Sequence, residues 1–259
     1  MPTQIHELAS VAPGAVLGED CTIGAFSVIG ENVVLGDRVR IDSHVVIDGH
    51  TEIGADTHVF PFASIGLAPQ DLKYRGEPTK VHIGERNLIH EYVTIHRGTP
   101  TGRGITMIGS DCLLMVQSHV AHDCIVGDEV IMANGATLGG HVEIGDRVNI
   151  GGLSGIHQFC RVGIEAFVGG SSIAVKDVMP FSLIQGNHAQ CYGMNRIGVR
   201  RRGYSKETIK ELSHAFHLLL AAKLNTSQAL ERIRSEIKGN EQVDLLVNFI
   251  ETAKRGVVK

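Results

Sequence analysis

Aliphatic residues recur at every sixth position along most of the first 170 residues, and this period is the dominant pattern of the sequence. The pattern comprises 24 hexads in three uninterrupted stretches, which begin at residues 11, 83 and 108. In fourteen hexads a glycine directly follows the aliphatic residue, as in Ile23-Gly24 and Ile144-Gly145. Six residues are too few for a repeat that contains a helix, so the period predicts one short strand and one turn per hexad.

The residue four places after the aliphatic one is usually small, for example Ser27, Ser118 or Ala136. Large and small inward positions at a fixed spacing fill a narrow prism, whose short strands hydrogen-bond to the neighbouring coils. We expect the glycine to lie at a corner where φ is unusual and the backbone approaches closely. The pattern resembles the hexapeptide-repeat acyltransferase superfamily. That resemblance implies a mainly β fold, a left-handed parallel β-helix with three strands per coil.

The hexads stop near Ala174, and the pattern becomes helical after Gly186. Ser205 is positioned to cap a helix with one apolar face, and further helices are predicted over about 227–239 and 240–256. The inward residues of the first and third helices are Ile209, Leu212, Phe216, Leu219, Leu220, Val243, Leu246, Val247 and Ile250. The predicted organisation is therefore a β-helix over 1–186 and a small helical domain over 187–259.

Composition and charge indicate the cellular compartment and the kind of partner. No apolar run is long enough to span a bilayer and no signal peptide is evident, so a cytoplasmic protein is expected. Four of the five cysteines, Cys21, Cys112, Cys124 and Cys160, occupy the small inward position and indicate core residues in a reducing compartment. The net charge of −4 divides into −10 for residues 1–186 and +6 for 187–259. This asymmetry indicates either a polar partner for the basic segment or a solvated helical surface.

The period is interrupted at about residues 71–82 and 101–107, which we interpret as loops ejected from the coil. Three strands per coil stack residues 18 apart, so both loops leave from one corner, where long loops commonly carry function. The hexads that then share one sheet are those of Ile65, Ile95, Val120, Leu138 and Ile156. Four histidines, His96, His122, His141 and His157, follow this corner on successive coils, and His119 ends the hexad before Val120. We interpret this row as a site.

A row of histidines can supply a general base near neutral pH or bind a metal ion, and the spacing leaves both open. The sequence contains no serine nucleophile elbow and no phosphate-binding Gly-Lys loop. Cys124 lies near His122, but its hexad position directs it inward, which disfavours a thiol nucleophile. Direct acyl transfer requires only a base, an oxyanion donor and a place to hold both substrates.

Several motifs surround this corner, and together they are far more specific than the hexads. They are Gln70-Asp71-Leu72-Lys73-Tyr74, Thr94-Ile95-His96-Arg97-Gly98, His119-Val120-Ala121-His122-Asp123-Cys124, Gly139-Gly140-His141-Val142, His157-Gln158-Phe159-Cys160, Gln185-Gly186-Asn187-His188-Ala189, Asn195-Arg196-Ile197-Gly198 and Arg201-Arg202-Gly203. Over essentially the whole chain, this combination resembles the UDP-N-acetylglucosamine O-acyltransferase family of lipid A biosynthesis.

The resemblance implies transfer of an (R)-3-hydroxyacyl chain from acyl carrier protein to the 3-hydroxyl of UDP-N-acetylglucosamine, without cofactor or metal. It also implies a homotrimer with active sites between neighbouring β-helices, and flat prism faces suit such symmetric packing. His122 would be the general base, Asp123 would orient or polarise it, and the Gly140 N–H would stabilise the oxyanion. The implied substrate-binding residues are Asp71, Lys73, His96, His119, His141, His157 and Gln158, with Asn195 and Arg201 at the nucleotide end.

Gly170 is implied to limit acyl chain length, because in this family a bulky residue near this position shortens the pocket. It lies 48 residues beyond His122, between two and three coils along the groove, or roughly 12–14 Å at a strand spacing of ~4.8 Å. Lacking a side chain, it predicts a relatively long acyl group; the alternative is a plain corner glycine. Acyl carrier proteins are strongly acidic, so the basic tail, including Arg196, Arg200, Arg202, Lys206 and Lys210, is expected to steer docking. Nucleic acid is not expected, because the chain is acidic and poor in aromatic residues.

Three alternatives remain open. The N-acyltransferase of the same pathway carries an extra N-terminal domain. Here the hexads begin by about Val11, which is expected to leave no room for such a domain. Trimeric β-helical carbonic anhydrases bind zinc through histidines five residues apart, whereas His119 and His122 are three apart. A non-enzymatic scaffold is disfavoured by the histidine row and the paired loops.

Overall fold

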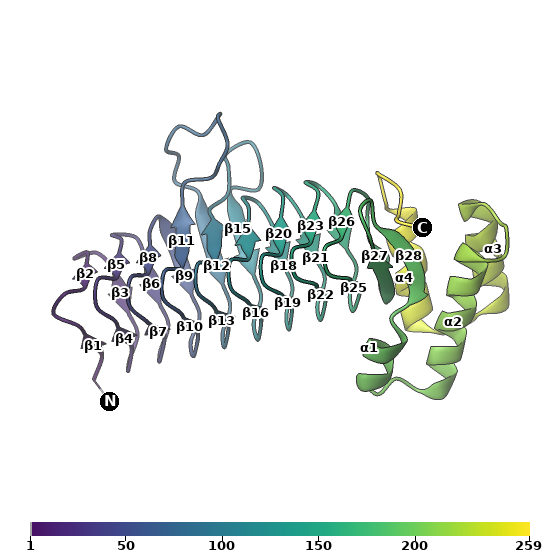
Figure 1. Ribbon diagram of the computed structural model, residues 1–259, viewed down its shortest axis with the longest axis horizontal. Coiled ribbons are helices and arrows are strands. Elements are labelled where there is room, and N and C mark those ends of the chain that lie inside the picture. The colour runs from purple at the N-terminus through teal and green to yellow at the C-terminus, as the bar shows by residue number, and fades with distance from the viewer. Residues whose placement is uncertain (1) are drawn as a thin grey trace.

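The computed structural model describes residues 2–259 as an elongated prism of stacked coils with helices at its C-terminal end (Figure 1). Each coil contributes one short strand to each of three sheets, here named A, B and C. The coil-to-coil pairs are parallel and in register, so that Val120 lies between Ile95 and Leu138 on neighbouring coils. The predicted alignment of the hexads of Ile65, Ile95, Val120, Leu138 and Ile156 on one sheet is confirmed.

The strands are short, most of them two residues long. Sheet A comprises β1 (Gln4–Ile5), β4 (Thr22–Ile23), β7 (Arg40–Ile41), β10 (His58–Val59), β13 (Leu88–Ile89), β16 (Leu113–Leu114), β19 (Ile131–Met132), β22 (Asn149–Ile150), β25 (Phe167–Val168), β27 (Ser182–Gln185) and β28 (Gln190–Met194). Sheet B comprises β2 (Ser10–Val11), β5 (Val28–Ile29), β8 (Val46–Ile47), β11 (Ser64–Leu67), β14 (Thr94–His96), β17 (His119–Val120), β20 (Thr137–Leu138), β23 (Gly155–Ile156) and β26 (Ile173–Ala174). Sheet C comprises β3 (Val16–Leu17), β6 (Val34–Leu35), β9 (His50–Ile53), β12 (Lys80–Ile83), β15 (Ile105–Ile108), β18 (Ile125–Val126), β21 (Glu143–Ile144) and β24 (Arg161–Val162).

The interior of the prism is filled as the hexads predict. The aliphatic residues and the small residues four places on are almost all buried in one continuous core. Cys21, Cys112, Cys124 and Cys160 are buried and free, which confirms their inward position. Burial raises the pKa of the Cys124 thiol to about 12, so this thiol does not supply a nucleophile at neutral pH.

The glycine that follows the aliphatic residue is required for a different reason from the one predicted. The residue with positive φ is the third after the aliphatic, such as Phe26 (φ 60°) or Arg147 (φ 58°), whereas Gly24 and Gly145 do not have positive φ. A Cβ on Gly145 would lie 2.7 Å from the backbone nitrogen of Ile164 on the next coil. Close stacking of coils therefore requires the glycine, and the expectation of an unusual φ there is wrong.

Two loops leave the prism together at the corner between sheets B and C, here called the B/C corner (Figure 1). They cover residues 68–79, between β11 and β12, and residues 97–104, between β14 and β15. Both end three residues earlier than predicted, because β12 and β15 extend to four residues each. They begin three and four residues earlier, because β11 ends at Leu67 and β14 at His96. Arg97 joins the loops, since its Nε donates to the Tyr74 hydroxyl at 2.8 Å and its Nη1 to the Gly66 carbonyl at 3.0 Å.

The C-terminal segment begins with a strand rather than a helix. Strand β28 lies beyond the predicted boundary at residue 186 and pairs antiparallel with β27 of sheet A. The helices that follow are α1 (Arg196–Arg201), α2 (Lys206–Leu220), α3 (Thr226–Glu236) and α4 (Glu241–Glu251). Ser205 caps α2 as predicted, by accepting from the Thr208 N–H. These helices bury a second apolar cluster, and the division into two domains stays a prediction.

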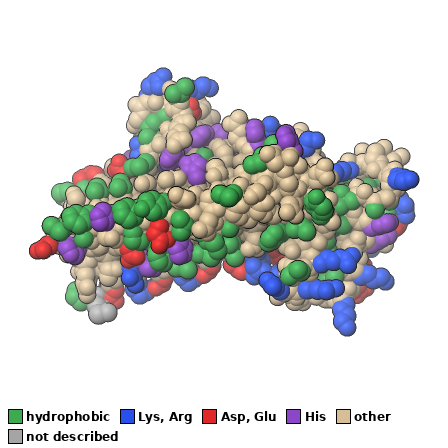
Figure 2. Space-filling model, viewed as in Figure 1, with side chains coloured by type: hydrophobic (Ala, Val, Ile, Leu, Met, Phe, Trp, Pro, Cys, Tyr) green, Lys and Arg blue, Asp and Glu red, His purple; other side chains and the backbone are tan. Residues whose placement is uncertain are grey.

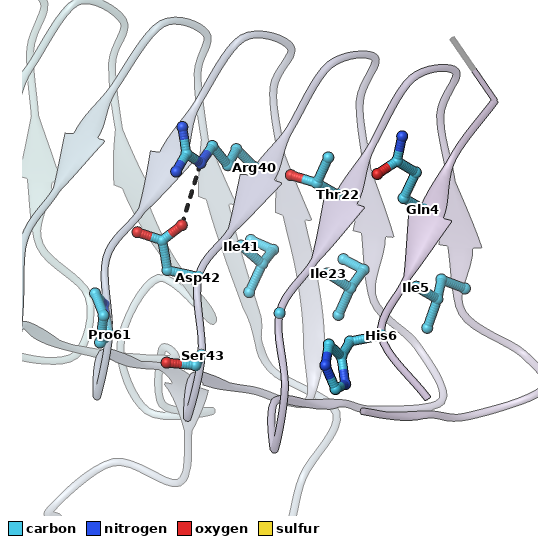
Figure 3. Close-up of a pocket in the computed structure, with 11 residues that line it drawn as sticks. Gln4, Ile5, His6, Thr22, Ile23, Arg40, Ile41, Asp42, Ser43 and Pro61 are labelled. Carbon is cyan, nitrogen blue, oxygen red and sulfur yellow. Dashed lines mark hydrogen bonds and ion pairs between the residues drawn. The ribbon is translucent and has the colours of Figure 1, made fainter. Parts of the chain in front are cut away.

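Among residues 2–259, no helix is long and apolar enough to cross a membrane. A shallow pocket of about 740 Å³ lies over the N-terminal coils of sheet A (Figure 3). Its lining residue Asp42 accepts from Arg40 at 3.2 Å and also lies 2.9 Å from His58 Nε2. None of its lining residues belongs to the predicted site, which lies elsewhere.

Candidate active site

The B/C corner repeats one turn on three successive coils beside the two loops. The second turn residues are His122, Gly140 and Gln158, and the third are Asp123, His141 and Phe159. The third residues have φ of 60°, 63° and 65°, so the turns share one backbone conformation and their side chains stack from coil to coil. Figure 2 shows histidines gathered at the base of the protruding loops.

His122 and Asp123 form a hydrogen-bonded pair. Nδ1 of His122 lies 2.9 Å from Oδ2 of Asp123. The Asp123 side chain is fully buried, whereas 18% of the His122 side chain is exposed. Burial alone would raise the pKa of Asp123, but hydrogen bonds from Thr99 and His122 outweigh it and the net pKa is lowered. Because an ionised carboxylate only accepts, Nδ1 of His122 carries the proton and Nε2 is left as a base.

The second loop wraps the Asp123 carboxylate. The N–H of Thr99 donates to both oxygens at 3.1 Å, and the Thr99 hydroxyl donates to Oδ2 at 2.6 Å. The N–H groups of Arg103 and Gly104 donate to Oδ1 at 2.8 and 3.1 Å. A buried carboxylate with this many donors keeps its charge.

Gly140 brings bare backbone against the imidazole of His122. A Cβ built on Gly140 would lie 2.6 Å from Cε1 and 2.8 Å from Nε2 of His122, so a side chain does not fit here. Within residues 2–259 the Gly140 N–H donates no hydrogen bond. The corner thus places an unengaged amide donor beside a base, the combination that stabilises an oxyanion during acyl transfer.

His141, on the next coil, lies against the His122–Asp123 pair. Its ring meets that of His122 edge-on at 5.1 Å, and its Nε2 lies 3.8 Å from Oδ2 of Asp123. The ring of Phe159 stacks on its other face at 4.5 Å. Burial lowers the pKa of His141, although the Asp123 charge partly opposes the shift. His141 is therefore predominantly neutral at pH 7.

His96, on the preceding coil, forms a second pair with His119, which lies on the same coil as His122. Their rings meet edge-on at 5.1 Å, and Nδ1 of His119 lies 2.6 Å from the Thr94 hydroxyl. Burial lowers the pKa of His96 to about 4, with smaller effects from His119 and His122. Nδ1 of His96 is buried without a hydrogen-bond partner. A neutral imidazole with an unused nitrogen is available to a bound polar group.

The remaining predicted residues at this corner are more exposed. Asp71 accepts from the Lys73 N–H at 2.9 Å in the first loop. Its negative charge acts to raise the pKa of His141, against the larger effect of burial. The exposed His157 contacts its neighbour, with Nδ1 3.1 Å from the Gln158 carbonyl. In the part of the chain that is described, no ring contact joins His157 to another histidine. The corner therefore brings together His96, His119, His122 and His141, with His157 at its margin.

Three predicted residues lie elsewhere on the prism. Gly170 is in a turn between sheets A and B, here called the A/B corner, so within one chain it does not share the B/C corner with His122. Asn195 caps α1 by accepting from the Gly198 N–H. Asn195 and Arg201 line a pocket of about 770 Å³ on sheet A. Sheet A is opposite the B/C corner, so one chain does not unite these residues with His122.

His122, Asp123 and His141 also form a group whose ligand atoms lie within 4.8 Å of one another, which meets the distance requirement for a metal. The donors from the loop already occupy the Asp123 oxygens. The carboxylate is thus arranged to hold a proton donor rather than a cation. This group does not include His119, whose Nδ1 lies 2.6 Å from the Thr94 hydroxyl.

Comparison with known proteins decides the family. Residues 177–258 match the model described as Udp N-acetylglucosamine O-acyltransferase, Domain 2, and residues 105–140 match the bacterial transferase hexapeptide model. The chain is 48% identical to the acyl-[acyl-carrier-protein]--UDP-N-acetylglucosamine O-acyltransferase of Thiobacillus denitrificans, over 98% of this chain and 99% of the relative. The chain belongs to the UDP-N-acetylglucosamine O-acyltransferase family.

Solved structures agree with this membership. The chain is 45% identical to LpxA from Acinetobacter baumannii, with a TM-score of 0.96 over 98% of this chain and 99% of the other. A UDP-N-acetylglucosamine acyltransferase from Bacteroides fragilis is 38% identical with a TM-score of 0.96 and the same coverage of both chains. The predicted fold class, a left-handed parallel β-helix followed by helices, is confirmed.

In this member of the acyltransferase family, the second loop contributes to the site in a way that the sequence did not predict. Thr99, Arg103 and Gly104 hold Asp123, yet none was predicted as a site residue. Arg103 and Gly104 lie outside the hexads and so have no register from which to place them. Thr99 occupies the small position of the Ile95 hexad, but in the structure it lies in the loop after β14. One available signal was the density of glycines at Gly98, Gly102 and Gly104, because a Cβ on Gly102 would collide with the Asp123 carboxylate.

Proposed function

We propose that the chain transfers an (R)-3-hydroxyacyl group from acyl carrier protein to the 3-hydroxyl of UDP-N-acetylglucosamine, the first step of lipid A biosynthesis. The observation that carries this proposal is the buried Asp123 paired with His122 beside the Gly140 amide, in a chain of this family. The donor and acceptor named for the relatives, acyl carrier protein and UDP-N-acetylglucosamine, supply the substrates.

In the proposed mechanism Nε2 of His122 removes the proton from the sugar hydroxyl as its oxygen attacks the thioester carbonyl. Asp123 keeps Nδ1 protonated and stabilises the imidazolium that forms. The Gly140 N–H stabilises the tetrahedral oxyanion. Collapse of this intermediate breaks the C–S bond, and the imidazolium returns its proton to the leaving thiolate. The ester and the free carrier thiol are the products.

We assign the other corner residues to substrate binding. His96 offers its unused nitrogen and His119 its imidazole, while His141 lies against the catalytic pair. Asp71 and Lys73 approach from the first loop, and Gln158 lies on the neighbouring coil. The remaining predicted residues, His157, Gly170, Asn195 and Arg201, complete the cleft.

We further propose a homotrimer in which the B/C corner of one chain faces sheet A of the next. This arrangement would place Asn195 and Arg201 of a neighbour opposite His122, which a single chain does not achieve. Closed threefold symmetry then repeats the same contact three times. Free, mostly buried cysteines support the cytoplasm as the compartment.

The direct test is to incubate the purified protein with UDP-N-acetylglucosamine and a panel of hydroxyacyl carrier proteins. We expect an O-acylated sugar nucleotide from wild type and nearly none from His122→Ala, because a positioned base contributes typically ~10²–10⁴-fold. The variant should still fold, trimerise and bind the sugar nucleotide. His141→Ala and His157→Ala serve as comparisons and should do less damage to the chemical step. Near-normal turnover by His122→Ala would refute the mechanism.

A further inference from the structure

The second loop is built around one carboxylate. Asp123 is fully buried, and its oxygens accept from the backbone of Thr99, Arg103 and Gly104. Gly102 passes so close to this carboxylate that a side chain there would overlap it. The side chain of Arg103 donates to the Asp123 carbonyl at 2.8 Å and also pairs with Glu143. Residues 97–104 therefore form a fitted cover over Asp123.

Thr99 donates to the same oxygen of Asp123 as His122 does, through its hydroxyl and, shared with the other oxygen, its N–H. The Thr99 hydroxyl lies 2.6 Å from Oδ2 of Asp123, and Nδ1 of His122 lies 2.9 Å from the same atom. A carboxylate oxygen has two lone-pair directions, so a hydroxyl on one of them directs the imidazole to the other. The Arg103 and Gly104 amides fix the opposite oxygen. The plane of the carboxylate is thus set from both ends.

Thr99 is itself held rigidly. It is 1% exposed, and its carbonyl accepts from the N–H groups of Gly102 and Gly104 at 3.1 Å. The hydroxyl is therefore carried by a fixed backbone and donates to a fixed acceptor. A donor held this way costs little reorganisation when charge develops on the neighbouring imidazole.

We propose that Thr99 is a positioning residue for acyl transfer, whose hydroxyl fixes the Asp123 carboxylate so that His122 presents Nε2 to the substrate. The proposal rests on the proposed function of this corner and assigns Thr99 a role through Asp123 rather than through the substrate. Thr99→Val removes the hydroxyl at nearly constant volume, and Thr99→Ser restores it. Because hydrogen bonds to charged groups are strong, Thr99→Val should lower kcat about 10- to 100-fold. KM and Kd for the sugar nucleotide should change by less than about 2-fold, since Thr99 binds no substrate.

Three controls separate positioning from a general loss of structure. Thr99→Ser should recover most of kcat. Thr57→Val removes another fully buried threonine hydroxyl, near the start of sheet A strand β10, and should leave kcat unchanged. In the Asp123→Asn background, Thr99→Val should have almost no further effect, because interacting residues are non-additive. An unchanged kcat in Thr99→Val, or a full multiplicative effect in the double variant, would overturn the proposal.

A second measurement does not depend on turnover. The Nδ1 proton of His122, hydrogen-bonded to a carboxylate, should give a downfield proton resonance that disappears in Asp123→Asn. In Thr99→Val we expect this resonance to move upfield as the hydrogen bond loosens. An unmoved resonance contradicts the positioning role even if wild type transfers no acyl group. Absence of transfer by wild type, with the resonance shifted as expected, would refute the proposed function alone.

Discussion

Asp123 illustrates how one residue obtains its chemistry from its surroundings. An ionised carboxylate removed from water is costly unless donors replace the lost hydration. Here the Thr99 hydroxyl and three backbone N–H groups do so, and the net pKa of Asp123 stays below its ordinary value. The charge is therefore retained at neutral pH, where His122 needs an acceptor for its Nδ1 proton.

Gly170 offers a test at the same scale. It does not have positive φ, and a Cβ added there would meet only the Gly152 carbonyl oxygen at 3.5 Å, an ordinary contact. The positive φ of this turn belongs to Ser171 instead. We therefore expect Gly170→Met to fold. If Gly170 lies at the end of the acyl pocket, its side chain should shift the preference toward shorter donors, since added volume in a filled site costs ~1–3 kcal/mol.

The measurement is kcat/KM for a series of hydroxyacyl carrier proteins of increasing chain length. Gly170→Ala provides a graded comparison and should move the optimum less than Gly170→Met. Equal loss with every donor, accompanied by a lower Tm, would show instead that Gly170 serves the turn alone.

Each of the three corners uses the same turn for a different purpose. The third turn residues of the C/A corner, which joins sheet C to sheet A, pair across coils as Arg38 with Asp56 and Arg86 with Asp111. Those of the A/B corner stack aromatic rings, as Phe62 does on Tyr92 at 5.0 Å. At the B/C corner, the same position supplies Asp123, His141 and Phe159. The repeat fixes where side chains stack, and their identity decides what the stack does.

This explains which elements could be predicted from the sequence. A six-residue period determines the pairing register, so the shared sheet of Ile95, Val120 and Leu138 followed directly from counting. The loops have no period, so neither their ends nor the Thr99 contact with Asp123 could be counted. Helix α1, six residues long, was too short to show a helical pattern. The role of Gly145 depends on the neighbouring coil, which no local pattern reveals.

The hexad glycine yields a prediction about the stacked coils. Gly145→Ala should lower the stability of the prism by ~1–3 kcal/mol, because its Cβ would meet the backbone of Ile164 at 2.7 Å. Gly170→Ala is the matched control, with its nearest contact at 3.5 Å, and should change stability little. Thermal unfolding of the two variants gives the comparison. Equal Tm values would contradict the close-approach explanation.

The basic helices yield a second element-scale prediction. The groove between α1 and α2 is lined by Arg196, Arg200, Lys206, Ile209 and Lys210. Lys and Arg gather at this end of the molecule (Figure 2). If this groove receives an acidic carrier protein, raising salt should raise the carrier KM more than the sugar-nucleotide KM. Arg200→Glu combined with Lys206→Glu should act the same way.

Lys238→Glu is a suitable comparison for the double reversal, because Lys238 lies outside the groove. It should leave the carrier KM nearly unchanged. A carrier KM insensitive both to salt and to the double reversal would show that the groove does not receive the donor.

At the scale of the whole molecule, the predicted site residues divide between two sides of the prism. His122, Asp123 and Gly140 lie at the B/C corner with the loops. Asn195 and Arg201 line the pocket on the opposite sheet A. A cleft that uses both sets needs two chains, so the assembly itself would complete the active site.

Mixed trimers test this division. His122→Ala and Arg201→Ala should each be nearly inactive alone, since every cleft lacks either its base or its nucleotide contact. When the two chains are combined at equal amounts, a cleft is intact wherever the corner of an Arg201→Ala chain faces sheet A of a His122→Ala chain. Random threefold assembly makes about a quarter of the clefts intact, so roughly a quarter of wild-type activity should return. Mixing His122→Ala with Asp123→Asn should restore nothing, because both changes lie in one corner. If the His122→Ala and Arg201→Ala mixture also stayed inactive in verified mixed trimers, the two residues would not share a cleft across chains.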